Sequence, residues 1–419
     1  MISNTKNQDN KTNLLNTYFL VLFSIIPFSI LLGPAISLIN ILLIVLTFLI
    51  FFYKQKNFIL LKDQTILLLI ILYIYFIFNS LISIDIEIGA MRNIGFVRYI
   101  VLFLAINYFF SIKGNLNKVL SVWISIVLIV LFDVIFEFSL GYNILGFESE
   151  NKKRIVSFFK DELIVGSFLN GVSFILIGYL FTNYEKKKNY QKVLVYLFLI
   201  LVVGSMIFTG ERSNTIKLLI GLFIFFSLNN KIKLKYKVFF IVSVISIFSV
   251  VYNNSSEIRH RYDNDLVNRL TNEDLRKEYI YFRIYNSGFE VFKKYPLLGV
   301  GNKNYRLETC RVQSNEKYLC FTHPHNIYLE FLSEHGIVGT LILLSIFFYL
   351  FFKNLKIMLL SRNLIQIGCF SFLLTQFVPI LPGGSFFTDF NATFFWINLS
   401  IFYASNLDTN IWKKYSALN

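Results

Sequence analysis

The chain has 419 residues, of which 55% are hydrophobic and 16% are charged, and its formal net charge is +15. Soluble domains are typically about 45–50% apolar, so this composition excludes an ordinary soluble enzyme. Apolar runs of about 20 residues, the length of a membrane-spanning helix, recur along the chain. Because backbone groups at that depth must bond within their own segment, the sequence predicts an all-α polytopic membrane protein. The runs lack the period-two alternation of membrane β-barrel strands.

Hydropathy along the chain predicts about twelve transmembrane helices. The first apolar run, from Tyr18 to Phe52, is too long for the apolar region of a signal peptide, so the N-terminus is expected to stay attached. Gly33 and Pro34 divide this run into two spans. The predicted spans cover residues 15–32, 35–53, 65–83, 93–112, 119–140, 166–183, 193–209, 214–229, 237–252, 327–352, 363–380 and 388–405.

Lysine and arginine are distributed unevenly among the short loops that join these spans. Loops on the side of the N-terminus carry far more of them than loops on the other side. The positive-inside rule therefore predicts that both termini are cytoplasmic. The chain is expected to divide into N-terminal transmembrane helices (1–252, about nine spans), a long outside loop (253–326) and C-terminal transmembrane helices (327–419, about three spans).

Aromatic residues recur with helical spacing inside the long loop. Phe282, Tyr285, Phe289 and Phe292 stand at positions i, i+3, i+7 and i+10. This spacing is typical of an amphipathic helix, which would lie along the membrane surface or cover the spans as a lid. Proline and glycine in the segment 296–301 are expected to end this helix.

Two of the three cysteines, Cys310 and Cys320, lie in the long loop, and Cys369 lies in an apolar span. A disulfide between the first two is expected if their compartment is oxidising; otherwise both are free thiols. No spacing of cysteine and histidine typical of a metal site is present. The phosphate-binding glycine loop and the common metal-binding motifs are also absent from the sequence. The sequence therefore predicts no metal and no cofactor.

Polar residues gather just before the tenth predicted span, in His323-Pro324-His325-Asn326. Pro324 disfavours helix at the residue before it, and Asn326 is a good N-cap for the helix that follows. His325 is therefore expected at the outer mouth of a transmembrane helix. The positive end of the helix dipole favours a neutral imidazole there, which is the form that accepts a proton. The alternative is an interfacial histidine that only caps the helix.

Further charged residues are expected at the same face of the membrane. Arg212 lies in the turn between two spans, and a guanidinium group suits bidentate contact with phosphate; the alternative is an anchor at the membrane interface. The segment 154–167 brings Arg154, Asp161 and Glu162 to this face. The two acids are expected either to orient the histidine and bind sugar hydroxyls, or to be solvated helix caps.

Four charged residues are expected inside the membrane-spanning segments. Arg98 and Lys217 are basic, and Asp133 and Glu137 share one face of the fifth span. Charged residues at such depth usually face a cavity or an opposite charge. The sequence does not determine which of these acids and bases form pairs.

The segment from His325 to Gly339 resembles the signature of the O-antigen ligase family of membrane glycosyltransferases. That signature is a His-Asn pair, nine residues and Gly-x-x-Gly, and this chain has His325-Asn326 followed by Gly336 and Gly339. The similarity is strongest from about Tyr279 to Leu341. The two glycines are expected on one helix face, where small residues let a neighbouring helix approach closely.

The resemblance implies a GT-C-like fold in the bacterial inner membrane with a periplasmic active site. It implies an undecaprenyl-diphosphate-linked glycan as donor, lipid A-core or another glycan as acceptor, and a metal-independent, inverting reaction without nucleic acid. His325 would be the general base, and Arg212 would hold the diphosphate together with a second arginine, for which Arg283 is the first candidate. The other candidates for this second position are Arg276, Arg306 and Arg311, and the predicted substrate-binding set also includes Asn326, Arg154, Asp161 and Glu162.

Three functions therefore compete. A ligase that transfers a glycan to lipid A-core is preferred, and a polymerase of the same superfamily shares the motif and the loop. A transporter would place charged or broken helices near the middle of the bilayer and repeat one half of the chain in the other. No such internal repeat is present. The sequence does not determine the donor sugar, the acceptor or the oligomeric state.

Overall fold

The computed structural model describes residues 2–56, 58–148, 154–160, 162–229, 232–311 and 318–416. Within these ranges the chain forms helices and no strands, so the predicted all-α class is confirmed. The helices before the long loop are α1 (Ile2–Ser24), α2 (Ile26–Leu31), α3 (Pro34–Gln55), α4 (Gln64–Leu81), α5 (Ile86–Gly95), α6 (Val97–Ser111), α7 (Asn115–Leu140), α8 (Val165–Phe181), α9 (Asn189–Phe208), α10 (Arg212–Leu228) and α11 (Leu234–Asn254). The helices that follow are α12 (Ser256–Tyr262), α13 (Arg269–Thr271), α14 (Glu273–Glu278), α15 (Ile280–Lys294), α16 (Tyr305–Arg311), α17 (Ile327–Phe352), α18 (Leu355–Ser361), α19 (Leu364–Gln376), α20 (Asp389–Ala404) and α21 (Ile411–Ser416).

Each predicted span coincides with a helix or with two consecutive helices. Among the described residues, seven helical segments are long and apolar enough to cross a membrane. The protein is therefore a multi-pass membrane protein. The other predicted spans coincide with shorter helices, and α19 ends at Gln376, before the predicted end of its span. The seven segments are Pro34–Gln55, Gln64–Leu81, Ile86–Ser111, Asn115–Leu140, Asn189–Phe208, Leu234–Asn254 and Ile327–Ser361.

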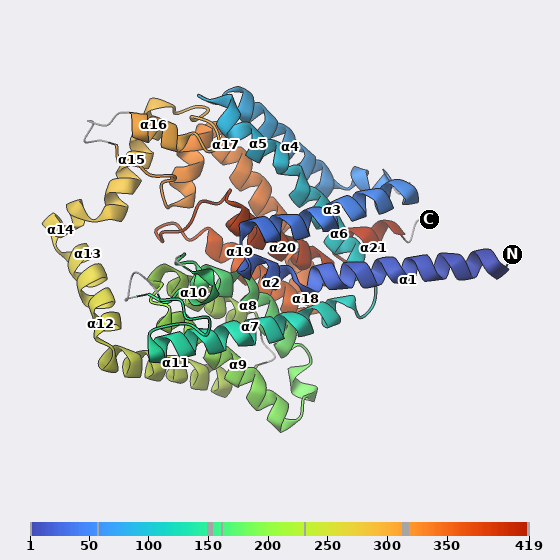
Figure 1. The fold of residues 1–419 in the computed structure, drawn as a ribbon, viewed down its shortest axis with the longest axis horizontal. Coiled ribbons are helices and arrows are strands. Elements are labelled where there is room, and N and C mark those ends of the chain that lie inside the picture. Colours follow the sequence, from blue (N-terminus) through green and yellow to red (C-terminus); the bar gives the residue numbers. More distant parts are fainter. Residues whose placement is uncertain are drawn as a thin grey trace.

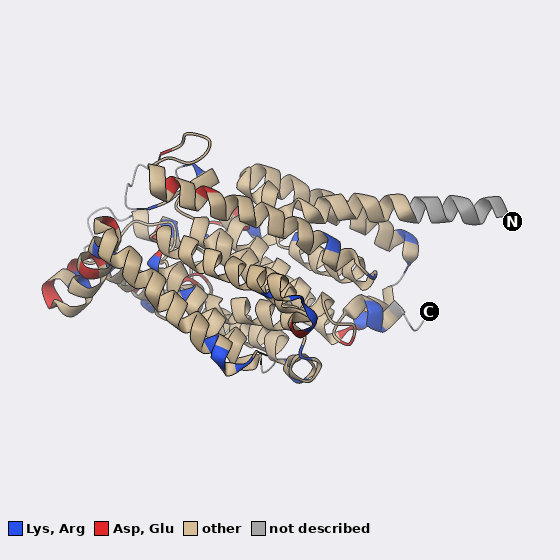
Figure 2. Ribbon diagram, turned by 90° about the horizontal axis from the view of Figure 1, so that it is seen from below, with Lys and Arg blue, Asp and Glu red and all other residues tan. Residues whose placement is uncertain are grey.

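The helices form one bundle (Figure 1). The most buried helices are α19 and α20, which pack against each other and against α8 and α6. Helices α1 and α21 extend to the right of Figure 1, whereas α12 to α15 lie at its left edge. Figure 2 shows acidic residues gathered around α12 to α14, with long uncharged stretches along the other helices. We call the end of the bundle that carries α12 to α15 the loop end.

The amphipathic helix predicted in the long loop is α15, but only part of its aromatic stripe faces the protein, where the Tyr285 hydroxyl donates to the carbonyl of Ile380 at 3.2 Å. Its buried residues are Ile284, Ser287, Gly288 and Val291, and this face packs against α17. Phe282 and Phe289 of the aromatic stripe are exposed. A small residue is needed at position 288 because a Cβ atom there would lie 2.9 Å from Pro324. The exposed aromatic side chains of α15 are therefore available to contact an apolar environment, as in a helix at a membrane surface.

Two cysteines connect the end of α16 to the segment before α17. Cys310 and Cys320 form a disulfide bond, with Cα atoms 4.5 Å apart. Cys369 is buried as a free thiol in α19. The disulfide closes a loop of the chain just before the histidines, so it limits the freedom of the segment that carries them.

Helix α17 is broken at Gly336, where φ is 62° and ψ is −172°. The segment Pro296–Gly301 crosses α17 at this break, and four backbone hydrogen bonds join the two: the amides of Val300, Gly301, Ile337 and Val338 donate to Ser333, Glu334, Pro296 and Leu297, respectively. The expectation that both glycines of the motif lie on a regular helix is therefore wrong at Gly336. Gly339 is helical and allows close approach, because a Cβ atom there would overlap the Tyr75 hydroxyl of α4.

Asp133 and Glu137, the two acids of the fifth predicted span, bind a loop rather than a basic side chain. The carboxylate of Glu137 accepts hydrogen bonds from the amides of Val156 (3.0 Å) and Ser157 (2.6 Å). Asp133 accepts from the amide of Ile144 (2.8 Å) and from the Ser157 hydroxyl. These two acids therefore fix the segment that follows Arg154 at the loop end.

Arg98, the basic residue of the fourth predicted span, forms an ion pair. Arg98 bonds to Asp389 at the start of α20, and its guanidinium group also lies 4.6 Å from the ring centroid of Tyr99. This pair joins α6 to α20.

Candidate functional site

His325 is held by the loop that joins α19 to α20, which we call the return loop (residues 377–388). The amide of Gly383 donates to the carbonyl of His325 at 2.9 Å. The ring Nδ1 of His325 lies 3.2 Å from the carbonyl of Gly383. His325 itself has φ of 52°, a left-handed conformation that costs about 1–3 kcal/mol for a residue with a side chain. The two bonds to Gly383 compensate this strain and fix the ring.

The return loop is attached to the first turns of α17 at further points. Asn326 caps α17, because its Oδ1 accepts from the amides of Tyr328 (3.1 Å) and Leu329 (3.2 Å). Its Nδ2 donates to the carbonyl of Pro379. One turn further on, the carboxylate of Glu330 accepts from the Ser385 hydroxyl and from the amide of Phe386. The N-cap predicted at Asn326 is confirmed, and both polar atoms of its side chain are engaged.

The surroundings of His325 favour a neutral ring with a free Nε2. A carbonyl oxygen only accepts hydrogen bonds, so the Nδ1 that faces Gly383 carries the proton. The neutral ring then has its lone pair on Nε2. Burial lowers the pKa of His325 below its ordinary value, and the bond to Gly383 opposes this shift. His325 is therefore suited to accept a proton through Nε2.

His323 lies beside His325, with ring centroids 4.0 Å apart. Its Nδ1 lies 3.0 Å from the Thr322 hydroxyl. Burial and the neighbouring His325 lower the pKa of His323 to about 4. Both rings are therefore neutral near pH 7. Among the described residues, no group of three or more His, Cys, Asp or Glu side chains is arranged to hold a metal ion.

Three arginines converge at the loop end, and we call Arg154, Arg212 and Arg261 the arginine cluster. The Nη1 of Arg212 donates to the carbonyl of Arg261 at 2.8 Å, and the Nε of Arg261 donates to the carbonyl of Gly210 at 2.9 Å. The short helix α12 thereby docks on the turn before α10. Burial and the charges of Arg212 and Arg154 lower the pKa of Arg261 to about 10. Burial is the larger cause of this lowering, and the two neighbouring positive charges add to it.

The carboxylate of Glu211 lies within this cluster. Glu211 lies 3.7 Å from Arg154, and it accepts from the amide of Gly166 (2.9 Å) and the side chain of Asn214 (2.6 Å). Burial raises the pKa of Glu211, while the charge of Arg154 opposes the rise. Asp265 also acts on Arg261, but among the described residues these two acids do not balance three guanidinium groups, so the cluster keeps an excess of positive charge. Such a site attracts an anion.

Tyrosines of the loop lie between the arginine cluster and His325. The ring centroid of Tyr281 is 5.9 Å from that of His325. Tyr281 also lies near enough to Arg261 to oppose the lowering of its pKa. Arg212 lies close to the Tyr279 hydroxyl, where it opposes the rise in pKa that burial causes. A substrate that contacts the arginines at one end is therefore within reach of the histidine at the other.

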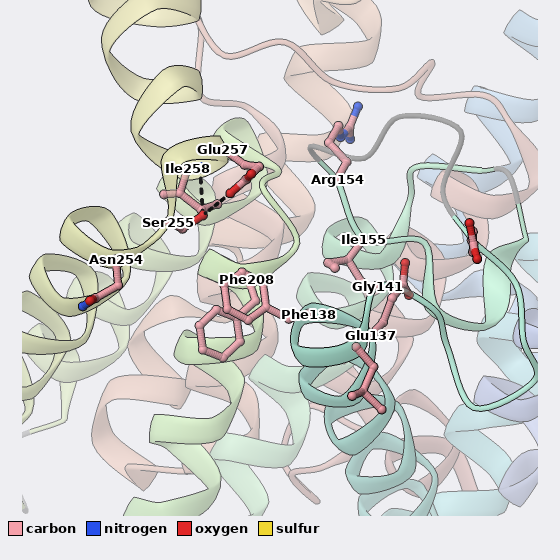
Figure 3. Close-up of a pocket in the computed structure, with 12 residues that line it drawn as sticks. Glu137, Phe138, Gly141, Arg154, Ile155, Phe208, Asn254, Ser255, Glu257 and Ile258 are labelled. Carbon is pink, nitrogen blue, oxygen red and sulfur yellow. Dashed lines mark hydrogen bonds between the residues drawn. The ribbon is translucent and has the colours of Figure 1, made fainter.

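A cavity of about 500 Å³ opens beside the cluster (Figure 3). Figure 3 shows Arg154 on one side and the start of α12 on the other. Cavities of this size hold small ligands or parts of larger ones. Arg154 belongs to both the cavity and the arginine cluster, so one substrate can occupy both. The cavity is lined by Glu137, Phe138, Leu140, Gly141, Glu148, Arg154, Ile155, Phe208, Asn254, Ser255, Glu257 and Ile258.

The other predicted substrate-binding residues lie away from these contacts or outside the described residues. Arg283 is exposed on α15, and within the described part of the chain its side chain forms no hydrogen bond or ion pair. Glu162 is exposed, and Asp161 lies outside the described residues. Sequence reasoning missed Arg261 and the return loop. Arg261 carries no motif of its own, and the only available signal was its place in a basic stretch with Arg259.

The fold and these contacts describe a multi-pass membrane protein with a histidine and a basic cluster at one end of its bundle. Residues 196–344 match the family model described as O-antigen ligase. This range includes Arg212, Arg261, the loop helices and the histidine motif, and it ends soon after Gly339. The segment 196–344 is therefore similar to the O-antigen ligase superfamily. A comparison with curated proteins finds no match.

Proposed function

We propose that the protein is an O-antigen ligase-like glycosyltransferase of the bacterial inner membrane. It would transfer a glycan from an undecaprenyl-diphosphate carrier to lipid A-core, with both termini cytoplasmic and the loop end in the periplasm. The observation that carries this proposal is the convergence of three arginines within reach of a neutral histidine. The match of residues 196–344 to the family model supports the same class of reaction.

In the proposed reaction His325 is the general base. The bond from Nδ1 to Gly383 leaves Nε2 free to take the proton of an acceptor sugar hydroxyl. As that proton leaves, the hydroxyl oxygen forms a bond to the anomeric carbon of the donor. The bond from this carbon to the phosphate oxygen breaks on the opposite face, so the anomeric centre is inverted. The electron pair of the broken bond stays on undecaprenyl diphosphate.

The arginine cluster is proposed to bind the diphosphate. Charge increases on the leaving group as the glycosidic bond breaks, and fixed guanidinium groups stabilise this charge without reorganising. Arg212 and Arg261 are the proposed ligands, and Arg154 connects them to the cavity beside α12. Arg283 remains a further candidate ligand because α15 also lies at the loop end.

A complementation assay tests this function. Wild type, His325→Ala and Arg261→Ala would be expressed at equal levels in a strain that lacks its own ligase, and the lipopolysaccharide would be separated on a gel. We expect a ladder with wild type and none with either variant. The matched control is Arg259→Ala, because Arg259 is exposed on the same helix and donates to the carbonyl of Asn253; it should restore the ladder.

A second strain, which lacks its polymerase and keeps its ligase, separates the ligase from a polymerase. A ligase variant that has lost activity leaves the glycan on the lipid carrier, whereas a polymerase variant leaves a single repeat on the core. A ladder restored in the second strain but not in the strain that lacks its ligase would move the assignment to polymerase and keep the chemistry of the site. A full ladder with His325→Ala would remove His325 from the mechanism.

A further inference from the structure

Lys217 of α10 is a buried cation that the proposed reaction does not yet use. Its side chain is 9% exposed. Within the described part of the chain it forms no ion pair or hydrogen bond, and the two acids that the sequence suggested for it hold the segment after Arg154 instead. A buried charge without a partner is costly, and intramembrane charges of this kind usually serve a substrate or ion.

The ammonium group of Lys217 lies beneath the return loop at Gly383. A Cβ atom at Gly383 would lie 3.3 Å from the Nζ of Lys217. Gly383 is also the residue that holds both the backbone and the ring of His325. Because Gly383 has no side chain, the ammonium group of Lys217 and the ring of His325 both lie next to this one residue.

Lys217 also lies deeper in the bundle than the arginine cluster. Lys217 lies five positions after Arg212, the first residue of α10, which is roughly 7.5 Å along a helix axis at 1.5 Å per residue. A lipid-linked diphosphate enters the site with its tail in the bilayer. The phosphate nearer the tail therefore lies deeper than the phosphate that carries the glycan.

We propose that Lys217 is a further substrate-binding residue, and that its ammonium group binds the lipid-proximal phosphate of the donor below Gly383. This rests on the proposed function, since it assigns one phosphate of the same donor. The arginine cluster then holds the phosphate nearer the glycan. The two phosphates would be bound from two depths, which would fix the anomeric carbon relative to His325.

Lipid binding by the purified protein tests this inference. The probes are undecaprenyl phosphate, which has only the lipid-proximal phosphate, and undecaprenyl diphosphate, which has both. We expect Lys217→Met to weaken binding of both lipids about tenfold or more, the effect of losing one charge-assisted hydrogen bond. Arg261→Ala should weaken binding of the diphosphate much more than binding of the monophosphate. Lys217→Arg, which keeps the charge, should retain most of the affinity.

A control and a stability measurement separate binding from a structural role. Lys237→Met also removes one positive charge, but Lys237 donates to the carbonyl of Phe226 at the other end of the bundle, so it should bind both lipids like wild type. Lys217→Met should melt at the same temperature as wild type or higher, because it removes an unpaired buried charge.

Two results would overturn the inference. One is wild-type affinity of Lys217→Met for both lipids while Arg261→Ala loses the diphosphate, which would leave the proposed function intact. The other is a clear loss of thermal stability in Lys217→Met, which would make the lysine a structural residue. If the wild-type protein binds neither lipid, the proposed function itself fails.

Discussion

The segment Pro296–Gly301 crosses α17 at its break, and we therefore expect a substitution of Gly336 to destabilise the protein strongly. Its φ of 62° and ψ of −172° belong to a region that is essentially restricted to glycine, and a side chain there costs about 1–3 kcal/mol. The added methyl group would also lie 2.3 Å from the backbone of Leu297. Relief of such overpacking typically costs about 1–3 kcal/mol more. Gly336→Ala should therefore lose about 2–6 kcal/mol, a large part of the stability of a typical protein.

The assay is the fraction of purified protein that stays monodisperse after heating, measured over a range of temperatures. Gly204→Ala is the matched control, because Gly204 lies within the helix α9 and no atom lies within 4 Å of its added methyl group. Alanine should be neutral or stabilising there. If Gly336→Ala melts at the same temperature as Gly204→Ala, the crossing does not constrain α17 and the reasoning is refuted.

Three further predictions concern pH and the disulfide. Activity that depends on a neutral His325 should persist below the ordinary histidine pKa of about 6.5 and fall only at lower pH, because burial lowers the pKa of this group; a pH profile of kcat/KM that falls from pH 7 would contradict this. The pKa of His323, about 4 in the folded protein, lies below its unfolded value, so the unfolded chain takes up this proton first and stability should decrease as pH falls from about 6.5 to about 4. His323→Gln should show a smaller decrease in melting temperature over that range. Replacing both Cys310 and Cys320 by serine should cost about 2–3 kcal/mol, and a reducing agent should lower the melting temperature of wild type but not of the variant.

The helical class and the order of the helices follow directly from hydropathy. A run of apolar residues long enough to cross a bilayer has few alternatives to a helix, because the backbone must satisfy its own hydrogen bonds. The limits of this reasoning appear at α19, which was expected to continue to residue 380. It ends at Gln376 because the residues that follow, although mostly apolar, form the return loop that binds His325 and Asn326. Hydropathy depends only on residue type, so it does not predict such contacts.

The candidate site was predictable where a residue has a local signal. His325 and Asn326 stand in a motif, and the cap at Asn326 follows from the residue type and from the proline before it. Arg261 has no such signal. Its role depends on α12 folding back onto the turn at Gly210, a contact across 51 residues of sequence. Arg283, which the resemblance made the first candidate for the second arginine, is exposed on α15.

The sequence by itself determined that this is an all-α membrane protein, that a long polar loop precedes its histidine motif, and which histidine lies at the mouth of a span. These features depend on hydropathy and on neighbours along the chain. Only the tertiary structure decided which arginines converge, that Glu137 and Asp133 hold a loop instead of a base, and that Gly383 lies next to both His325 and Lys217. These are contacts between segments far apart in sequence, and their geometry depends on the packing of the whole bundle.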